Sequence, residues 1–246
     1  MNNTPLVSWY EGTNEFSKKV DYTVNYGTVD ADSSSPKKTF YIWNNRGGQK
    51  DCPKMEEVTF TTREREGGTT VEAVRDNWFR VRVDSLGETD DKSWTEVGKG
   101  GVGTKNPTGL KDLGTNGTTT NKHAETAQVW SSGKTLALGA YVKPTTPNGY
   151  IYKVINAGET SEKEPSWVKV EGNTFIENGI EYLSVKIEKT PNAKEILGLA
   201  NDTKEDGSNA HLAGGNFVQI TVYAEVPITA NAGKNSLVQR VSYRYV

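Results

Sequence analysis

Apolar and polar residues alternate along much of this chain, with the period of two that is typical of half-buried β-strands. Five such segments lie before residue 98 and two lie after residue 216. Stretches rich in Gly, Asn and Ser separate several of them and indicate turns. The expected strands are residues 20–26, 39–43, 58–62, 78–83, 93–97, 217–223 and 237–245.

The pattern changes between residues 98 and 122, where Gly, Thr, Asn and Lys dominate and apolar residues are few. Such a stretch is typical of a surface loop or linker, and its length indicates a domain boundary. A second β-rich block follows at residues 129–189. After it we expect a short helical turn at 193–198 and a polar loop at 201–209.

The number of strands indicates how these parts combine. Seven short antiparallel strands make an immunoglobulin-like β-sandwich, whereas five leave exposed edges and a lone hairpin is marginally stable. We therefore expect the last two strands to complete the sheets begun by the first five. This predicts an all-β chain in which residues 1–128 and 190–246 form the sandwich and residues 129–189 form a small inserted β module. The alternative is two domains in series.

Two Asn-Gly pairs predict two hairpins in the middle block, at residues 148–149 and 178–179. Asn-Gly favours the type I′ turn, in which both central residues have positive φ. Alternation places Tyr150, Tyr152 and Val154 on one face of their strand. The strands are expected at 140–143 with 150–154, and at 174–176 with 180–185.

Charge and composition exclude several classes of function. The chain has 29 basic and 31 acidic side chains, interspersed along its length, so no nucleic-acid-binding patch is expected. No apolar run is long enough to span a membrane, and residues 1–4 have no feature of a signal peptide. Cys52 is the only cysteine, so no internal disulfide is expected. We expect the protein to fold in a cytoplasm.

Four aromatic residues of the middle block are the candidate ligand-binding residues: Trp130, Tyr150, Tyr152 and Trp167. The apolar face of a sugar packs well on an exposed aromatic ring, while polar neighbours bind its hydroxyls. The competing interpretation is that these side chains form the core of the module. Its small size favours the core, because a small domain needs its large side chains inside.

No catalytic constellation is found in the sequence. The glycine-rich stretch 98–103 lacks the Gly-Lys-Ser/Thr ending of a phosphate-binding loop, and no helical pattern follows it. The acidic residues of 201–209 do not have the EF-hand spacing for calcium. Neither His123 nor His211 lies near a nucleophile motif. We therefore expect no enzymatic activity, no cofactor and no metal site.

The order of short motifs in the middle block resembles a module common in virion proteins of tailed phages. More distantly, it resembles the small chitin-binding type of carbohydrate-binding domain. The likeness covers about a quarter of the chain, and Ile180-Glu181-Tyr182 stands where such modules often have Val-Thr-Trp. The motifs are Trp-Ser-Ser-Gly-Lys at 130–134, Leu-Gly-Ala-Tyr-Val-Lys-Pro at 138–144, Asn-Gly-Tyr-Ile-Tyr-Lys at 148–153, Ala-Gly-Glu-Thr-Ser at 157–161, Glu-Pro-Ser-Trp at 164–167 and Asn-Gly-Ile-Glu-Tyr at 178–182.

The strands outside the block are similar in pattern to the immunoglobulin-like domains of phage capsids and tails. Together the two resemblances imply a non-enzymatic, decoration-type structural protein on the capsid, neck or tail. It would assemble in the host cytoplasm with other virion proteins, in multiple symmetric copies, and its inserted module would project outward. The alternative is an adhesion or receptor-binding protein whose inserted module binds host cell-surface glycan. A third reading is an accessory domain of a cell-wall hydrolase.

Overall fold

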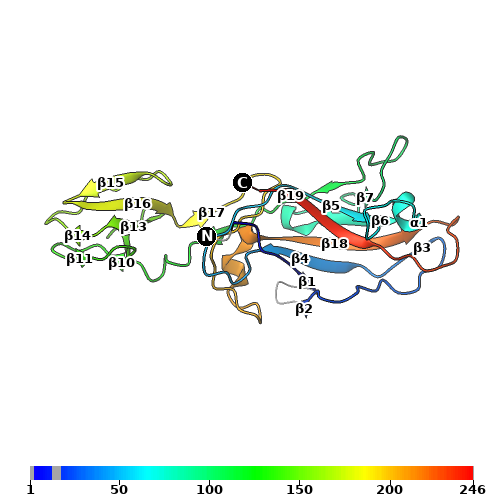
Figure 1. Cartoon of the computed structure of the whole chain (residues 1–246), viewed down its shortest axis with the longest axis horizontal. Coiled ribbons are helices and arrows are strands. Elements are labelled where there is room, and N and C mark those ends of the chain that lie inside the picture. The colour runs from blue at the N-terminus through cyan, green and yellow to red at the C-terminus, as the bar shows by residue number, and fades with distance from the viewer. Residues whose placement is uncertain (1–2, 13–17, 246) are drawn as a thin grey trace. The chain divides into compact units, whose positions relative to one another are not determined.

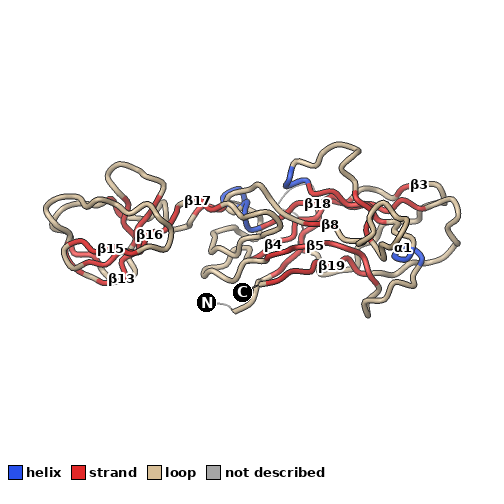
Figure 2. Tube along the Cα trace, turned by 90° about the horizontal axis from the view of Figure 1, so that it is seen from above, coloured by secondary structure: helices blue, strands red, loops and turns tan. Residues whose placement is uncertain are grey.

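A computed structural model describes residues 3–12 and 18–245 and shows an all-β chain, as the alternating pattern predicts (Figure 1). The chain divides into two compact units. The sandwich unit comprises Met1–Thr118 and Thr190–Val246, and the inserted unit comprises Thr119–Lys189. The inserted unit therefore contains residues 119–128 in addition to the expected block at 129–189. Strands make up most of the regular structure in both units (Figure 2).

The larger sheet of the sandwich unit is antiparallel, with the strand order β2-β1-β4-β18-β6-β7 and β3 paired to the end of β18. Its central strand, β18, comes from the C-terminal part of the chain and pairs with β4 and β6 from the N-terminal part. The strands are β1 (Val7–Glu11), β2 (Lys18–Lys19), β3 (Ser33–Ser34), β4 (Lys38–Asn44), β6 (Phe79–Val83), β7 (Thr95–Val97) and β18 (Phe217–Val226).

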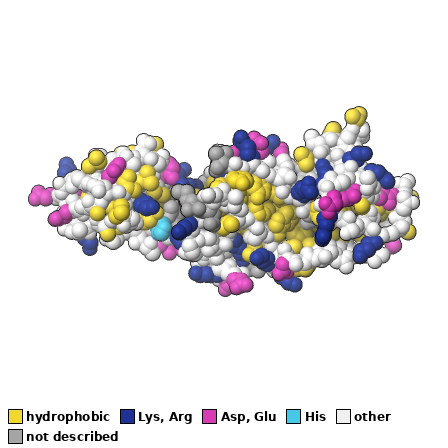
Figure 3. Space-filling view, in the orientation of Figure 1, with side chains coloured by type: hydrophobic (Ala, Val, Ile, Leu, Met, Phe, Trp, Pro, Cys, Tyr) yellow, Lys and Arg dark blue, Asp and Glu magenta, His cyan; other side chains and the backbone are white. Residues whose placement is uncertain are grey.

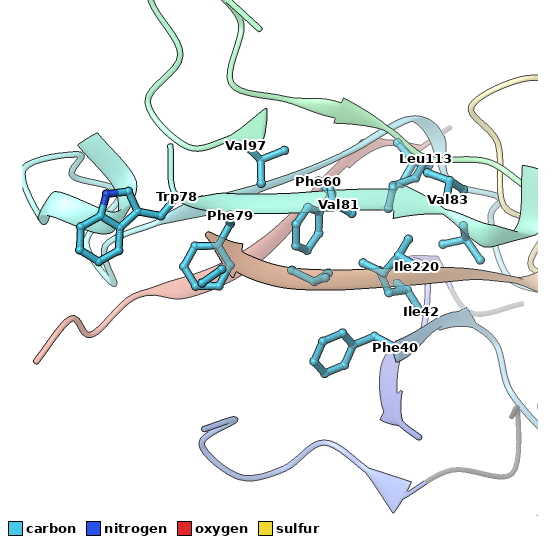
Figure 4. Close-up of a cluster of buried hydrophobic side chains, with 14 of the residues drawn as sticks. Phe40, Ile42, Phe60, Trp78, Phe79, Val81, Val83, Val97, Leu113 and Ile220 are labelled. Atoms are coloured by element: carbon cyan, nitrogen blue, oxygen red, sulfur yellow. The ribbon is translucent and has the colours of Figure 1, made fainter. Parts of the chain in front are cut away.

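The smaller sheet contains β19 (Val238–Arg244), β5 (Glu56–Arg63) and β8 (Lys111–Asp112), in that order. One hydrophobic core contains inward side chains of both sheets, which makes the unit a sandwich. Figure 4 shows Phe60 and Leu113 together with Phe40, Val81 and Ile220 in this core. Strands β18 and β19, from the C-terminal part of the chain, both pair with strands of the N-terminal part.

Two expected elements of the sandwich unit are absent. The alternating segment 20–26 bends at Tyr22 and belongs to no strand, although the Val20 amide donates to the Trp9 carbonyl and Val20, Val24 and Tyr26 pack against the core. Its pattern reflects one-sided burial, which does not require a hydrogen-bonded neighbour. The expected helical turn at 193–198 is also wrong, because Ile196 forms an antiparallel bridge with Met55. The helices of the described residues are α1 (Glu72–Arg75), η1 (Asp84–Leu86), η2 (Ala210–Leu212) and η3 (Gly214–Asn216).

The inserted unit is built on a five-stranded sheet of order β10-β12-β13-β16-β15. Two short pairs accompany it, β11 with β14 and β9 with β17. Strands β9 and β17 are the first and last of the unit, so the chain enters and leaves it through neighbouring strands. The bounds are β9 (Thr119–Thr120), β10 (Gln128–Val129), β11 (Thr135–Leu136), β12 (Tyr141–Lys143), β13 (Tyr150–Asn156), β14 (Gly158–Glu159), β15 (Thr174–Glu177), β16 (Ile180–Lys186) and β17 (Glu188–Lys189).

Only one of the two Asn-Gly pairs forms the expected turn. Asn178 and Gly179 both have positive φ, at 44° and 83°, which suits a type I′ turn between β15 and β16. At the other pair Gly149 alone has positive φ. The connection from β12 to β13 is longer there, and the Asn148 side chain accepts a hydrogen bond from the Tyr150 amide at 3.0 Å. The type I′ prediction for residues 148–149 is therefore wrong.

Candidate functional site

The four predicted binding residues all lie on the core of the inserted unit. Tyr152, on β13, has a fully buried side chain, whereas Trp130, Tyr150 and Trp167 are half-buried and pack against the same cluster. The structure brings Tyr152 and Trp167 into direct contact, with ring centroids 4.3 Å apart. Because no part of Tyr152 reaches the surface, its ring cannot offer a face to a sugar.

Two further rings complete this aromatic cluster. Phe175 on β15 and Tyr182 on β16 stack at 5.1 Å, and Trp167 meets Tyr182 edge to face at 5.7 Å. The register pairs Phe175 with Tyr182 and Val154 with Tyr182, so neighbouring strands place the rings on one face of the sheet. The cluster therefore forms the core of the inserted unit.

The polar edges of these rings are also used within the unit. The Tyr152 hydroxyl donates to the Val168 carbonyl at 3.1 Å, and the Trp167 indole donates to Glu164 at 2.8 Å. Glu164 also accepts hydrogen bonds from the amide and hydroxyl of Thr145. Burial raises the pKa of Glu164, but these hydrogen bonds outweigh it and hold that pKa below its usual value. Hydrogen bonds at their polar edges thus hold the Tyr152 and Trp167 rings in place.

Glu177 is a buried carboxylate that the sequence did not single out. Its Oε1 accepts hydrogen bonds from the Trp130 indole at 3.2 Å and from the amide and hydroxyl of Ser161. Its Oε2 accepts from the Tyr182 hydroxyl at 2.7 Å. Burial and this contact with Glu177 raise the pKa of Tyr182 far above its usual value. A carboxylate engaged by four donors has a structural role, because it anchors Trp130, Ser161 and Tyr182.

A second group of aromatic and charged residues lies on the outer face of the larger sheet. Alternation along β6 turns Phe79, Val81 and Val83 inward, which leaves Arg80 on the outer face. The register then places Arg80 beside Tyr223 of β18 on one side and beside Glu96 of β7 on the other. Sequence reasoning missed this group. Its only signal was that these residues occupy the polar positions of alternating segments.

Ion pairs fix the charged members of this group. Arg80 contacts Glu225 through Nε at 3.0 Å and Glu96 through Nη2 at 3.3 Å. Its Nη1 donates to the Asn77 carbonyl at 2.6 Å. A guanidinium bound on three sides has one orientation, and it holds the two carboxylates on either side of it.

Trp94 and Tyr223 form the aromatic part of the group. Their rings meet edge to face, with centroids 4.7 Å apart and planes at 87°. The Arg82 guanidinium lies 4.8 Å from the Trp94 ring centroid, and the ammonium of Lys37 lies 5.0 Å from it. Arg82 itself is anchored to Asp84 at 2.8 Å. These cation–π and edge contacts set the orientation of a tryptophan that is only half-buried.

Two surface hollows adjoin this group and share Arg80 and Glu225. The larger, of about 340 Å³, contains both aromatic rings and both carboxylates; the smaller is about 200 Å³. The larger is lined by Arg80, Asp91, Lys92, Trp94, Glu96, Lys105, Tyr223 and Glu225. The smaller is lined by Asp32, Ser33, Ser34, Asp76, Asn77, Trp78, Arg80, Glu225, Val226 and Pro227.

One border of the sandwich is only partly covered. Within the described residues β19 pairs with β5 alone, so its other edge makes no ladder, and there Gln239 of β19 donates a side-chain hydrogen bond to the Tyr26 hydroxyl. Val241 and Tyr243 of β19, together with Val7 and Trp9 of β1, are half-buried against the core. In Figure 3 hydrophobic side chains gather over the middle of this unit, where β1 and β19 lie.

Two further residues considered from the sequence, His123 and Cys52, have packed surroundings. The ring of His123 stacks on Tyr141 with centroids 4.2 Å apart, and Cys52 is buried. Burial raises the pKa of the Cys52 thiol. Residues 3–12 and 18–245 contain no cluster of three or more His, Cys, Asp or Glu side chains placed to hold a metal ion. None of the helices in that same part of the chain has the length and hydrophobicity needed to cross a membrane.

Comparisons with protein-family models, with curated proteins and with solved structures gave no match to this chain. The inserted unit presents a core, the outer face of the larger sheet presents a polar and aromatic surface, and the sandwich has an open border.

Proposed function

We propose that the protein is a non-enzymatic, decoration-type structural subunit of a tailed-phage particle. The observation that carries this proposal is the open border of the sandwich along β19. A strand with an unpaired edge beside half-covered apolar side chains is a ready template for pairing with another chain. In a particle the neighbouring virion protein would supply that chain, and symmetry would repeat the contact in many copies.

The inserted unit supports the same proposal. Its aromatic side chains pack against one another and their polar groups form hydrogen bonds within the unit, so these contacts stabilise the fold of the unit itself. The chain enters and leaves it through the paired strands β9 and β17, which lets a sandwich carry the unit between two of its strands. Together with the motif resemblance, this fits a module displayed outward on the capsid, neck or tail. The site of action would be the virion, after assembly in the host cytoplasm.

Recognition of host cell-surface glycan is the second candidate function. The inserted unit gives it little support, because Tyr152 is in the core and Trp167 is packed on it; glycan contacts of Trp130, Tyr150 and Trp167 stay a prediction. The specific observation in its favour is the aromatic and charged hollow on the sandwich unit.

The role of the open border in docking can be tested with two lysine substitutions on edge strands. Ser242→Lys places a charge on the exposed side of β19, whereas Ile176→Lys does so on β15, the edge strand of the inserted unit, at a position 73% exposed. We expect both variants to fold. Ser242→Lys should lower incorporation into purified particles by about tenfold or more, which corresponds to a loss of ~1.4 kcal/mol of docking energy. Ile176→Lys should leave incorporation unchanged.

Electron microscopy of the assembled particle gives the direct readout. We expect density for the subunit at symmetric positions, with β19 against a neighbouring virion protein. Particles that never contain the protein would refute the proposal, and equal incorporation of both variants would refute the role of β19.

A further inference from the structure

The larger hollow on the sandwich unit has balanced charge. Its lining contains three basic side chains, Arg80, Lys92 and Lys105, and three acidic ones, Asp91, Glu96 and Glu225. An anion or a cation would meet groups of its own sign beside groups of the opposite sign, so a charged ligand gains little there. The eight lining residues therefore favour a ligand without net charge. The cations of Lys37 and Arg82 lie beside them against the Trp94 ring, and Arg82 is paired with Asp84.

The aromatic wall of the hollow suits a ligand with an apolar face. Trp94 and Tyr223 stand at 87° to one another and form a corner. The CH face of a sugar ring would pack on the parts of these rings that the ring–ring contact and the Lys37 and Arg82 side chains leave uncovered. Arg82, bound to Asp84 and to the Thr89 carbonyl, keeps Trp94 in place. Little conformational freedom would be lost on binding, which favours affinity.

The carboxylates supply hydrogen-bond acceptors in fixed positions. Arg80 contacts Glu96 through Oε1 and Glu225 through Oε2. Among the described residues the other oxygen of each carboxylate has no hydrogen-bond partner, so each can accept a bond from a hydroxyl. Hydrogen bonds to an ionised carboxylate are about twice as strong as those between neutral groups. The ligand should therefore carry hydroxyl donors next to its apolar face.

We propose that this hollow binds a neutral saccharide, with Trp94 and Tyr223 against the sugar face and Glu96 and Glu225 accepting its hydroxyls. The volume of the larger hollow, about 340 Å³, lies near the lower end of the ~300–1,000 Å³ typical of small-molecule sites, and that of the smaller, about 200 Å³, lies below it. Because the smaller hollow shares Arg80 and Glu225, a second sugar unit of the same chain extends into it. This site is separate from the aromatic residues of the inserted unit and does not depend on a role in a phage particle.

The test uses the purified full-length protein and a glycan array that contains neutral, sialylated and sulfated oligosaccharides. We expect neutral glycans to bind, with affinity that changes less than about twofold between 50 and 500 mM salt, because no net charge is neutralised. The affinity of the best neutral ligand is then measured by titration calorimetry. Binding only to the charged glycans, or to none, would overturn the proposal.

Three variants locate the site. Trp94→Ala should weaken binding of that ligand by about tenfold or more, and Glu225→Gln by several-fold, because each removes a direct contact. Tyr245→Ala is the matched control, since Tyr245 is an exposed aromatic residue, 45% accessible, just beyond β19 of the other sheet. Circular dichroism checks that each variant is folded, and Trp94→Phe replaces Trp94→Ala if the latter unfolds.

Unchanged affinity in both Trp94→Ala and Glu225→Gln would overturn the assignment, as would an equal loss in Tyr245→Ala. Binding that is lost instead in Trp130→Ala would move the site to the inserted unit. These measurements need no particle, so their failure is distinguishable from a failure of the proposed structural role.

Discussion

Two of the contacting Trp–Tyr pairs in the described residues share their chemistry but lie in different surroundings. Trp167 lies on the buried Tyr152 of the inserted unit with centroids 4.3 Å apart, and Trp94 meets Tyr223 on the outer face of the sandwich at 4.7 Å. The first pair belongs to a hydrophobic core, whereas the second borders a hollow lined by charged groups. Ring contact alone therefore does not indicate whether an aromatic pair stabilises the fold or is available to a ligand.

The supply of aliphatic side chains explains the difference. Within the described residues the main core of the sandwich has eighteen buried apolar side chains, mostly Val, Ile, Leu, Met and Phe. The core of the inserted unit has six, and two of them are Tyr152 and Tyr182. A small unit has too little interior to leave its largest side chains outside. The sandwich fills its core without Trp94 and Tyr223, which leaves both rings on the surface.

The largest effect should come from breaking the buried pair. Tyr152→Ala removes a fully buried ring, and we expect it to lower the free energy of unfolding of the inserted unit by about 4 kcal/mol. Tyr152→Phe keeps the ring and loses only the hydroxyl contacts with Asn148 and Val168, for a cost of about 1 kcal/mol.

Chemical denaturation with hydrogen exchange read out for residues 119–189 measures both variants separately from the sandwich. A loss below 1 kcal/mol in Tyr152→Ala would mean that the ring contributes little to the core, and the sugar-stacking interpretation would regain its basis.

Alkaline pH should destabilise the inserted unit in a graded way. Burial and the hydrogen bond to Glu177 raise the pKa of Tyr182, so in the folded unit the hydroxyl keeps its proton at a pH where an unfolded tyrosine, with a pKa near 10, loses it. The folded state then binds more protons. Stability is therefore fully present below pH ~10 and falls as the pH rises above that value.

Tyr182→Phe sharpens this test because it removes the titrating group and keeps the ring. The decrease in unfolding free energy between pH 9 and pH 11, followed at residues 119–189, should be smaller in this variant than in the wild type. Burial also raises the pKa of Tyr152, so a residual decrease is expected. An identical decrease in both proteins would exclude Tyr182 as its source.

The smallest effect on stability should come from the exposed pair. Trp94→Ala removes cation–π and edge contacts of a half-buried ring, and we expect the free energy of unfolding of the sandwich to fall by about 1 kcal/mol or less. Thermal unfolding followed by circular dichroism measures the change. A loss of about 3 kcal/mol or more would place Trp94 among the structural residues and remove the contrast between the two pairs.

Most strands could be predicted because the alternation of inward and outward side chains along a strand is a local property of the sequence. The alternating segments at 39–43, 58–62 and 78–83 correspond to β4, β5 and β6, and those near the C-terminus correspond to β18 and β19. The same rule failed at 20–26, where the chain buries alternate side chains without a ladder. Alternation reports which side chains are inward, and it does not report hydrogen bonds.

The candidate site could be predicted only in part. The sequence identified the aromatic residues of the inserted unit and both interpretations of them, but not which interpretation holds for Tyr152. Alternation was its only sign of the group around Arg80, and the positions of Trp94, Glu96, Tyr223 and Glu225 look like ordinary solvated positions of separate strands. Neither could it separate the two Asn-Gly turns, since loop length and the side-chain contact of Asn148 decide between them.

The all-β class, most strand positions and the sidedness of each strand follow from the local order of residues, because neighbouring side chains on a strand point to opposite faces. The tertiary structure alone decides which strands are neighbours. It places β18 between β4 and β6 and β7 beside β6, so that Trp94, Arg80 and Tyr223 meet from three parts of the chain. It also places Trp167 over Tyr152. Whether a side chain is core or surface depends on what distant segments put on top of it, and no local pattern contains that information.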